Sequence, residues 1–314
     1  MDIYEQAYEY FSGIPVAAEW EEAKVLFHHI ASKKPYHWSL PVSACEAVGG
    51  SPEQAIPAVV AMGCAHISII LVDDMLDMDP RGEYQRIGAP AAANLACAFQ
   101  AASLEAIALS KIKPDILSEA FANFNRMFFM TALGQHWDVL GFDDEESYWR
   151  MMRTKSSPFF GVALQVGALL GRASNKTADQ LEKIGCLYGE MIQIHDDLTD
   201  TMAVPANPDW LQGRSPLPIL FAKSTDHPER NRFLELLQKV SDEESLHEAQ
   251  EILIRCGAVS YCVDKLLCKH QAAQDLLDTV SLPRREVLDV LLEDVAAPVW
   301  RLFEAVGEPV VKST

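Results

Sequence analysis

The chain has 314 residues, of which 49% are hydrophobic and 23% charged, and this composition excludes a largely disordered protein. Its formal net charge of −19 gives no electrostatic attraction to nucleic acid or to an anionic membrane surface, so an anionic substrate would have to bind through local cations or metal ions. The seven cysteines form no C-x-x-C pair, which argues against zinc and redox motifs. With an acidic N-terminal segment in place of a signal peptide, they favour a reduced, cytoplasmic location.

Helix-forming residues dominate, and no long stretch alternates with a period of two, so we predict an all-α fold. A cap residue and a proline, Ser51 and Pro52, precede the uncharged run Ala55–Val72. This run is close to the length that spans a bilayer, but it contains His66 and continues directly into Asp73. We therefore expect a buried core helix and no transmembrane segment.

Further helices are expected along the rest of the chain. Their predicted ranges are Ala89–Leu109, Pro114–Leu140, Glu145–Leu170 and Thr177–Thr201, the last with a capping box at Thr177-x-x-Gln180. The proline-rich stretch Ala203–Pro218 predicts a loop, and shorter helices follow to Leu302, the last one starting near Pro283. Disorder is expected only at Pro309–Thr314. We predict a single domain, residues 1–314, built as one large helix bundle.

The same acidic pattern occurs twice. Asp73, Asp74 and Asp77 lie in L-V-D-D-M-L-D, and Asp196, Asp197 and Asp200 lie in I-H-D-D-L-T-D. In each copy the residues at i and i+4 stack on one helix face, and each copy closes an apolar stretch. Carboxylates in such a place need neutralisation, which hard divalent cations such as Mg²⁺ supply together with substrate phosphates. One copy alone would be typical of a solvated helix end, whereas two copies favour a metal site.

With these paired motifs, the chain resembles the trans-isoprenyl diphosphate synthase family, also called polyprenyl synthetases, from Lys33 to Leu220. The resemblance implies an antiparallel bundle of the class I isoprenoid synthase type, with the two clusters facing each other across a central cavity, and a homodimer. It implies three Mg²⁺ ions that bind the diphosphate of an allylic substrate while its C–O bond breaks. Asp73, Asp77 and Asp196 would be direct ligands, and Asp74, Asp197 and Asp200 would act through water or as supporting partners.

Other landmarks follow the family order around the clusters. Lys155-Ser156 stands where the family has a Lys-Thr pair whose lysine contacts the allylic diphosphate. The further matches are Gln193, Gly134-Gln135 with Asp138, and Arg214 in the Gly213-Arg214-x-x-Leu217-Pro218 segment. The resemblance assigns Lys155, Gln135, Gln193 and Arg214 to substrate binding.

The expected site for a second substrate, isopentenyl diphosphate, departs from the family pattern. Lys34 is kept from the family's Gly-Gly-Lys-Arg-x-Arg signature, but Pro35 and His37 replace its two arginines. His66 matches a histidine that contacts this diphosphate, and Arg81 replaces one arginine of a pair. Because neither proline nor histidine reproduces the bidentate grip of arginine on phosphate, the acceptor pocket is weakened or repurposed.

Product length depends on what lines the pocket. Ser68 and Ile69, five and four residues before Asp73, supply no aromatic floor, so a long prenyl chain could extend past Ala65. An aromatic ring from another helix could instead close the cavity; the candidates are Phe128, Phe129, Trp137 and Phe159.

Three functions remain open at this point. The first is a chain-elongating prenyl diphosphate synthase. The second is a terpene synthase-like enzyme that ionises a preformed prenyl diphosphate and cyclises or hydrates it, or prenylates a non-isoprenoid acceptor. The lost arginines favour this second function, and the absence of the N-D-x-x-S-x-x-x-E motif of terpene cyclases argues against it. The third is a regulatory subunit of a heteromeric synthase, although such subunits tend to lose an aspartate cluster.

Overall fold

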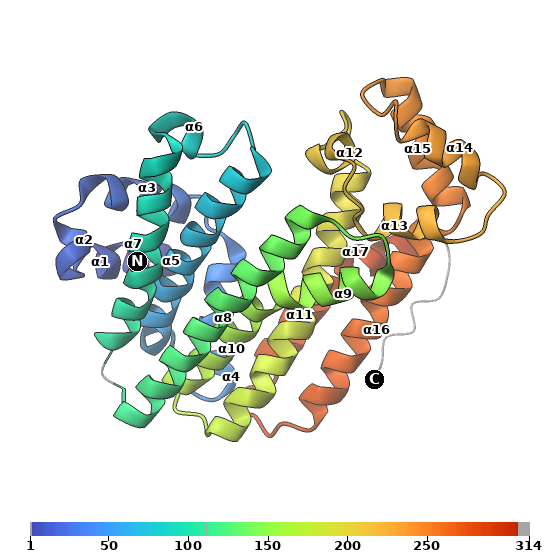
Figure 1. Cartoon of the computed structure of the whole chain (residues 1–314). Coiled ribbons are helices and arrows are strands. Elements are labelled where there is room, and N and C mark those ends of the chain that lie inside the picture. The colour runs from blue at the N-terminus through green and yellow to red at the C-terminus, as the bar shows by residue number, and fades with distance from the viewer. Residues whose placement is uncertain (1, 111, 307–314) are drawn as a thin grey trace. The chain divides into compact units, whose positions relative to one another are not determined.

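The structure is a computed structural model that describes residues 2–110 and 112–306, with side chains described as far as Arg301. The tail for which disorder was predicted, Pro309–Thr314, lies outside the described residues. Every regular element in the described ranges is a helix, which confirms the all-α prediction (Figure 1).

The helices follow one another with short connections. Their bounds are α1 Ile3–Ser12, α2 Pro15–Ala18, α3 Glu21–Ala31, η1 Tyr36–Ser39, α4 Leu40–Ala47, α5 Pro52–Asp77, α6 Tyr84–Ile87, α7 Ala89–Ala108, α8 Pro114–Leu140, α9 Glu145–Lys155, α10 Ser157–Leu170, α11 Asn175–Thr201, α12 Pro208–Gln212, α13 Leu217–Ser224, α14 Arg230–Leu236, α15 Glu243–Arg255, α16 Ala258–Asp278 and α17 Glu286–Val306.

The chain divides into two compact units. Unit 1 comprises the described residues of Met1–Ala132, Pro158–Cys186 and Asp275–Leu291, and unit 2 those of Leu133–Ser157, Leu187–Gln274 and Leu292–Thr314. The expectation of a single domain over residues 1–314 therefore stays a prediction.

Helix α5 is the centre of unit 1. It packs against α1, α3, α4 and α7, and its residues from Ala55 to Ala65 are buried on all sides, as its unbroken apolar sequence predicts (Figure 1). The helix starts as expected, with Pro52 in its first turn and the Ser51 amide donating to Gln54 Oε1 at 2.8 Å.

Two helices, α5 and α7, are long and apolar enough to cross a membrane by length and composition alone. The most apolar stretch of α5 is 72% buried inside the protein, as expected of a core helix, while that of α7 is 39% buried.

Two predicted helix boundaries were wrong. The range Glu145–Leu170 is not one helix, because the chain breaks at Ser156 between α9 and α10. Pro158, in the first turn of α10, has no amide hydrogen to continue the ladder, and its ring would clash with the carbonyl four residues earlier. Helix α11 starts at Asn175 rather than at Thr177, since Ser174 Oγ caps it by accepting from the Thr177 amide at 3.1 Å.

Unit 2 has its own apolar core beneath α12 to α15. Trp210, Ile219, Phe233, Leu236 and Leu253 are among its buried members. Helix α12 lies inside the stretch for which a loop was predicted; it starts after Asn207, whose side chain caps it. The last helix begins at Glu286, just beyond a turn at residues 283–285.

Candidate functional site

The first aspartate cluster lies at the C-terminal end of α5 in unit 1. Asp73, Asp74 and Asp77 are partly exposed there, whereas the helix before them is buried. The helix ends at Met78, which has a left-handed φ of 53°, and the Asp79 amide then donates to the Asp74 carbonyl at 2.9 Å. The cluster thus stands where a buried helix reaches the surface.

Negative charge accumulates around this helix end. Burial, followed by the charges of Asp79 and Asp73, raises the pKa of Asp74 to about 6. Arg81, the cation that follows the cluster, holds Asp79 with two hydrogen bonds, Nε to Oδ1 at 3.1 Å and a terminal nitrogen to Oδ2 at 2.8 Å. The arginine is therefore directed at a carboxylate that the motif analysis did not include.

The carboxylates fit a hard cation. Oxygen donors are the ligands that Mg²⁺ prefers, and it usually takes one or two carboxylates together with water and phosphate oxygens. Among the residues that the structure describes, no three His, Cys, Asp or Glu side chains converge closely enough to hold a metal ion by themselves. An ion held by these carboxylates would therefore need further ligands, such as water.

The second cluster lies near the C-terminal end of α11 in unit 2. Asp196 and Asp200 retain exposed surface, whereas Asp197 is buried. Loss of water around the Asp196 carboxyl group, followed by the charges of Asp200 and Asp197, raises the pKa of Asp196 to about 6.

Asp197 is a buried hydrogen-bond acceptor for three elements. Its carboxylate accepts from the Tyr148 hydroxyl of α9 at 2.8 Å, from Gln193 Nε2 of α11 at 2.9 Å and from the Leu217 amide at the start of α13 at 2.8 Å. Burial still raises its pKa to about 6. Because its two oxygens are occupied by protein donors, Asp197 ties α9, α11 and α13 together rather than pointing at solvent.

The end of α11 is fixed by two further side chains. Trp210 Nε1 donates to the Thr201 carbonyl at 2.9 Å, and Gln250 Nε2 donates to the same oxygen at 3.1 Å. These donors satisfy a carbonyl that the helix itself leaves unpaired, so the aspartates one turn earlier stand on a rigid support.

Two of the predicted substrate-binding cations lie close together in unit 2. Lys155 Nζ is 2.6 Å from Asp138 Oδ2, and an Arg214 guanidinium nitrogen is 3.8 Å from the same oxygen. Gly134 makes this approach possible, since a Cβ atom there would lie 2.3 Å from the Lys155 amide nitrogen. Asp209 lies 3.7 Å from Arg214 on its other side. The cations are held by carboxylates that an anionic ligand would have to complement or displace.

The predicted glutamines behave differently from each other. Gln193 accepts from Ser156 Oγ at 2.9 Å while it donates to Asp197, so it links the break between α9 and α10 to the second cluster. Gln135 is buried, and its amide nitrogen has no hydrogen-bond partner among the described residues.

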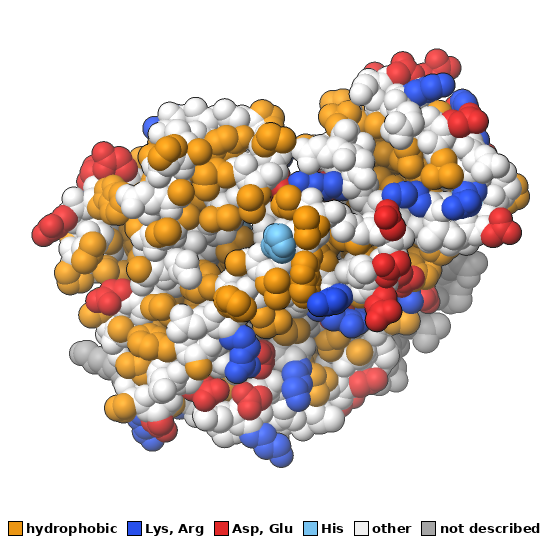
Figure 2. Space-filling model, in the orientation of Figure 1, with side chains coloured by type: hydrophobic (Ala, Val, Ile, Leu, Met, Phe, Trp, Pro, Cys, Tyr) orange, Lys and Arg blue, Asp and Glu red, His pale blue; other side chains and the backbone are white. Residues whose placement is uncertain are grey.

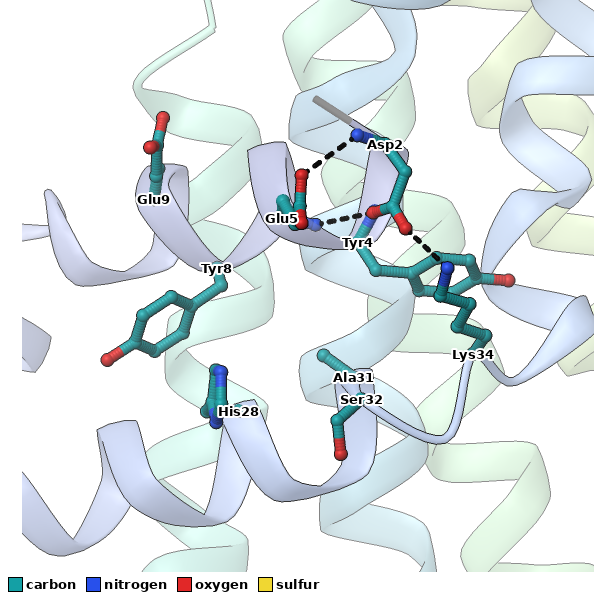
Figure 3. A pocket seen from close by; sticks show the side chains of 9 residues that line it. All are labelled: Asp2, Tyr4, Glu5, Tyr8, Glu9, His28, Ala31, Ser32 and Lys34. Atoms are coloured by element: carbon teal, nitrogen blue, oxygen red, sulfur yellow. Dashed lines mark hydrogen bonds and ion pairs between the residues drawn. The ribbon is translucent and has the colours of Figure 1, made fainter.

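Lys34, predicted to bind a second diphosphate, forms an ion pair instead. Its ammonium lies 2.7 Å from Asp2 Oδ2, in the wall of a hollow of about 520 Å³ between α1 and α3 (Figure 3). None of the six clustered aspartates lines this hollow. It is lined by Asp2, Tyr4, Glu5, Tyr8, Glu9, His28, Ala31, Ser32 and Lys34.

His66, the histidine predicted for the second-substrate site, lies in an aromatic group with His37, which replaces a family arginine. His66 accepts from Trp38 Nε1 at its Nδ1 atom, 3.1 Å away, and its ring centroid is 4.1 Å from that of His37. Burial, followed by the proximity of His37, lowers the pKa of His66 well below its usual value, and burial lowers that of His37 to about 4. Both rings are therefore neutral at pH 7.

The candidates for pocket lining are not equally accessible. Ala65 is fully buried and Ser68 is 5% exposed, so both face the core of unit 1. Ile69 is partly exposed, on the same side of α5 as His66 and Asp73. Sequence reasoning missed Tyr148, although its place two turns before Lys155 on α9 was a usable signal.

The surface carries no obvious electrostatic site for a polyanion on the face that Figure 2 shows. There the described Lys and Arg side chains are scattered among acidic and apolar ones rather than gathered into one patch (Figure 2). That nucleic acid is not a partner stays a prediction from the net charge of −19.

Comparisons with known proteins place the chain in a family. The family model described as polyprenyl synthetase matches residues 30–253. The short chain isoprenyl diphosphate synthase of Methanothermobacter thermautotrophicus is 28% identical over 275 residues, which cover 82% of this chain and 84% of the relative.

Solved structures share the fold. The geranylgeranyl pyrophosphate synthetase of Pyrococcus horikoshii superposes with a TM-score of 0.80 at 22% identity, over 93% of this chain and 94% of the other. The geranylgeranyl pyrophosphate synthase of Corynebacterium glutamicum, solved with calcium and isoprenyl diphosphate, gives a TM-score of 0.78 at 21% identity, over 95% of each chain. Together with the family match over more than two thirds of its length, these likenesses show that the chain belongs to the polyprenyl synthetase family, the prenyltransferases known as trans-isoprenyl diphosphate synthases.

Proposed function

We propose that this protein ionises an allylic prenyl diphosphate with the help of Mg²⁺ ions and passes the prenyl group to an acceptor. The observation that carries the proposal is the pair of D-D-x-x-D clusters, one ending α5 and one near the end of α11, in a chain of this family. We further propose that the two clusters face one cavity in the working enzyme and that three ions bind between them.

Each cluster would contribute in its own way. Asp73, Asp77 and Asp196 would hold the ions, which supply the positive charge that stabilises the departing diphosphate. Lys155 and Arg214, already paired around Asp138, would exchange part of that pairing for diphosphate oxygens. Asp197 would keep α11 fixed against α13 while the C–O bond breaks.

The names of the relatives support chain elongation as the reaction that consumes the prenyl cation. In that reaction the double bond of isopentenyl diphosphate attacks the cation and a proton is lost, which leaves a longer diphosphate. His66, Lys34 and Arg81 would then contact the second diphosphate. The absence of an aromatic side chain at Ser68 and at the partly exposed Ile69 supports a long prenyl chain.

A second candidate is a terpene synthase-like reaction on the same scaffold, with no second diphosphate. The observation that favours it is that Lys34 is paired with Asp2 and Arg81 with Asp79. In this structure both cations therefore face carboxylates, although both side chains remain largely exposed. A homodimer is proposed from the family resemblance, and a cytoplasmic location from the cysteine pattern.

A purely regulatory role is the weakest proposal because both clusters are intact.

The test is release of pyrophosphate from geranyl, farnesyl or geranylgeranyl diphosphate in Mg²⁺. Asp73→Asn and Asp196→Asn are each expected to lower the rate by ~100-fold or more, because each removes a metal ligand without changing shape. Asp115→Asn, at an exposed carboxylate in the first turn of α8, is the matched control and should keep the rate. Near-normal release by both cluster variants would refute the proposal.

A further inference from the structure

The group around His66 is built so that this histidine stays neutral. A Cβ atom at Gly63 would lie 3.0 Å from the Trp38 ring, so glycine at this position lets the indole lie close against α5. The indole N–H then reaches Nδ1 of His66, less than one turn further along the helix. Because an indole nitrogen can only donate, Nδ1 must accept and the ring proton must sit on Nε2. Protonating His66 would set two N–H groups against each other.

His37 and Phe159 complete the group. The His37 ring stands edge-on to His66 with centroids 4.1 Å apart, and the Phe159 ring lies 5.6 Å from His37 and 6.1 Å from His66. His37 Nε2 is buried and has no hydrogen-bond partner among the described residues. His66 makes no described hydrogen bond other than that from Trp38, so its Nε2 proton is also unused. We call His37, Trp38, His66 and Phe159 the histidine box.

The histidine box lies on the same side of α5 as the first aspartate cluster. His66 and Asp73 are seven residues apart, which is about two helical turns and about 10 Å along the axis. Ile69, Ile70 and Asp77 share this helix face and keep some exposure, and from Val72 onwards the other sides of the helix become exposed as well. One strip of this helix therefore runs from the metal-binding carboxylates to the two unused imidazole nitrogens.

We propose that the histidine box is the acceptor site of this enzyme and that it binds an uncharged, hydroxyl-bearing molecule, water included, instead of a second diphosphate. The inference rests on the proposed ionisation of an allylic diphosphate. A hydroxyl complements the box, since its oxygen can accept from His66 Nε2 and its proton can be donated to His37 Nε2. A diphosphate would have to be buried against two neutral rings, neither of which supplies the positive charge that such a ligand requires.

The reaction balances without a further reagent. The allylic C–O bond breaks and both of its electrons leave with pyrophosphate. The hydroxyl oxygen supplies the electron pair of the new C–O bond to the prenyl carbon, and its proton passes to His37 Nε2. The product is a prenyl alcohol when the acceptor is water and a prenyl ether when it is an alcohol.

The experiment uses the full chain with Mg²⁺ and farnesyl or geranylgeranyl diphosphate in ¹⁸O-water, with and without isopentenyl diphosphate. Pyrophosphate release and the extracted products are measured separately. We expect release without isopentenyl diphosphate and ¹⁸O in the product hydroxyl. Release that requires isopentenyl diphosphate and yields a longer diphosphate overturns this inference alone, as does a product that is only hydrocarbon. No release in either arm overturns the proposed function as well.

A variant pair tests the histidine box itself. His37→Phe keeps a ring of similar shape and removes no described hydrogen bond, so the fold should survive. We expect the ratio of hydroxylated to hydrocarbon product to fall by ~10-fold or more, compared at equal amounts of released pyrophosphate so that a general loss of activity does not affect the ratio. His29→Phe, on the exposed side of α3, is the control and should leave the ratio unchanged. An unchanged ratio in His37→Phe overturns the role of His37.

Discussion

The two aspartate clusters have the same sequence pattern but different surroundings. In the first, the middle carboxylate of Asp74 is partly exposed, and no described residue donates a hydrogen bond to it. In the second, the middle carboxylate of Asp197 is buried and accepts three hydrogen bonds from three helices. The same motif therefore has two roles, since Asp74 adds negative charge at the surface and Asp197 holds neighbouring helices together.

The sharpest way to break this comparison is to remove each middle carboxylate in turn. Asp197→Ala should lower the free energy of unfolding by about 3 kcal/mol or more, because it leaves a hydroxyl, an amide side chain and a backbone amide without an acceptor. Asp74→Ala should change it by less than about 1 kcal/mol, or raise it slightly, since like charges separate. Urea unfolding of metal-free protein measures both, and equal losses would contradict the division of roles.

A second prediction concerns the pH dependence of stability in unit 1. Burial lowers the pKa of His37 in unit 1 to about 4 from an ordinary 6.5, so the unfolded chain binds protons that the folded chain does not. Above pH 6.5 His37 does not reduce the free energy of unfolding. As the pH is lowered from 6.5 towards 4, that free energy falls by at most about 3 kcal/mol because of this group. His37→Phe should reduce this loss when unfolding is measured at pH 7 and at pH 4.5. The same slope in parent and variant would show that His37 titrates normally.

The smallest expected effect isolates one donor to Asp197. Tyr148→Phe removes a buried hydroxyl from that carboxylate and should lower the free energy of unfolding by about 1 to 2 kcal/mol. Pyrophosphate release should fall only if the substitution displaces α11. Tyr84→Phe is a suitable control, since its hydroxyl accepts from Gln85 on an exposed turn. A loss as large as that of Asp197→Ala would mean that Tyr148, and not the carboxylate, is the centre of this junction.

Sequence patterns predicted most of the fold because its signals are local. The start of α5 follows from Ser51 and Pro52, and its burial follows from an uncharged run. The break at Ser156 was missed, although Pro158 marked it, because helical segments lie on both sides of it. The start of α11 was misplaced by two residues, since Ser174 and Thr177 are both competent caps.

The environment of the site was less predictable, because it depends on contacts between distant segments. Nothing local to Lys34 shows that Asp2 is its partner, and nothing local to Asp197 shows that the Leu217 amide is. The protonation of His66 required knowing that Trp38 points its only donor at one ring nitrogen. Spacing within a helix could predict which residues share a face, but not which of them the rest of the chain would bury.

The contact between Trp38 and Gly63 also limits which substitutions this protein can accept during evolution. A methyl group at position 63 would require the indole to shift by a few tenths of an ångström, which would strain its hydrogen bond to the imidazole at position 66. We therefore expect the residues at positions 38, 63 and 66 to vary together. Relatives that replace one of the three residues are expected to replace the others as well. A change to a positively charged pocket would require substitutions at all three positions.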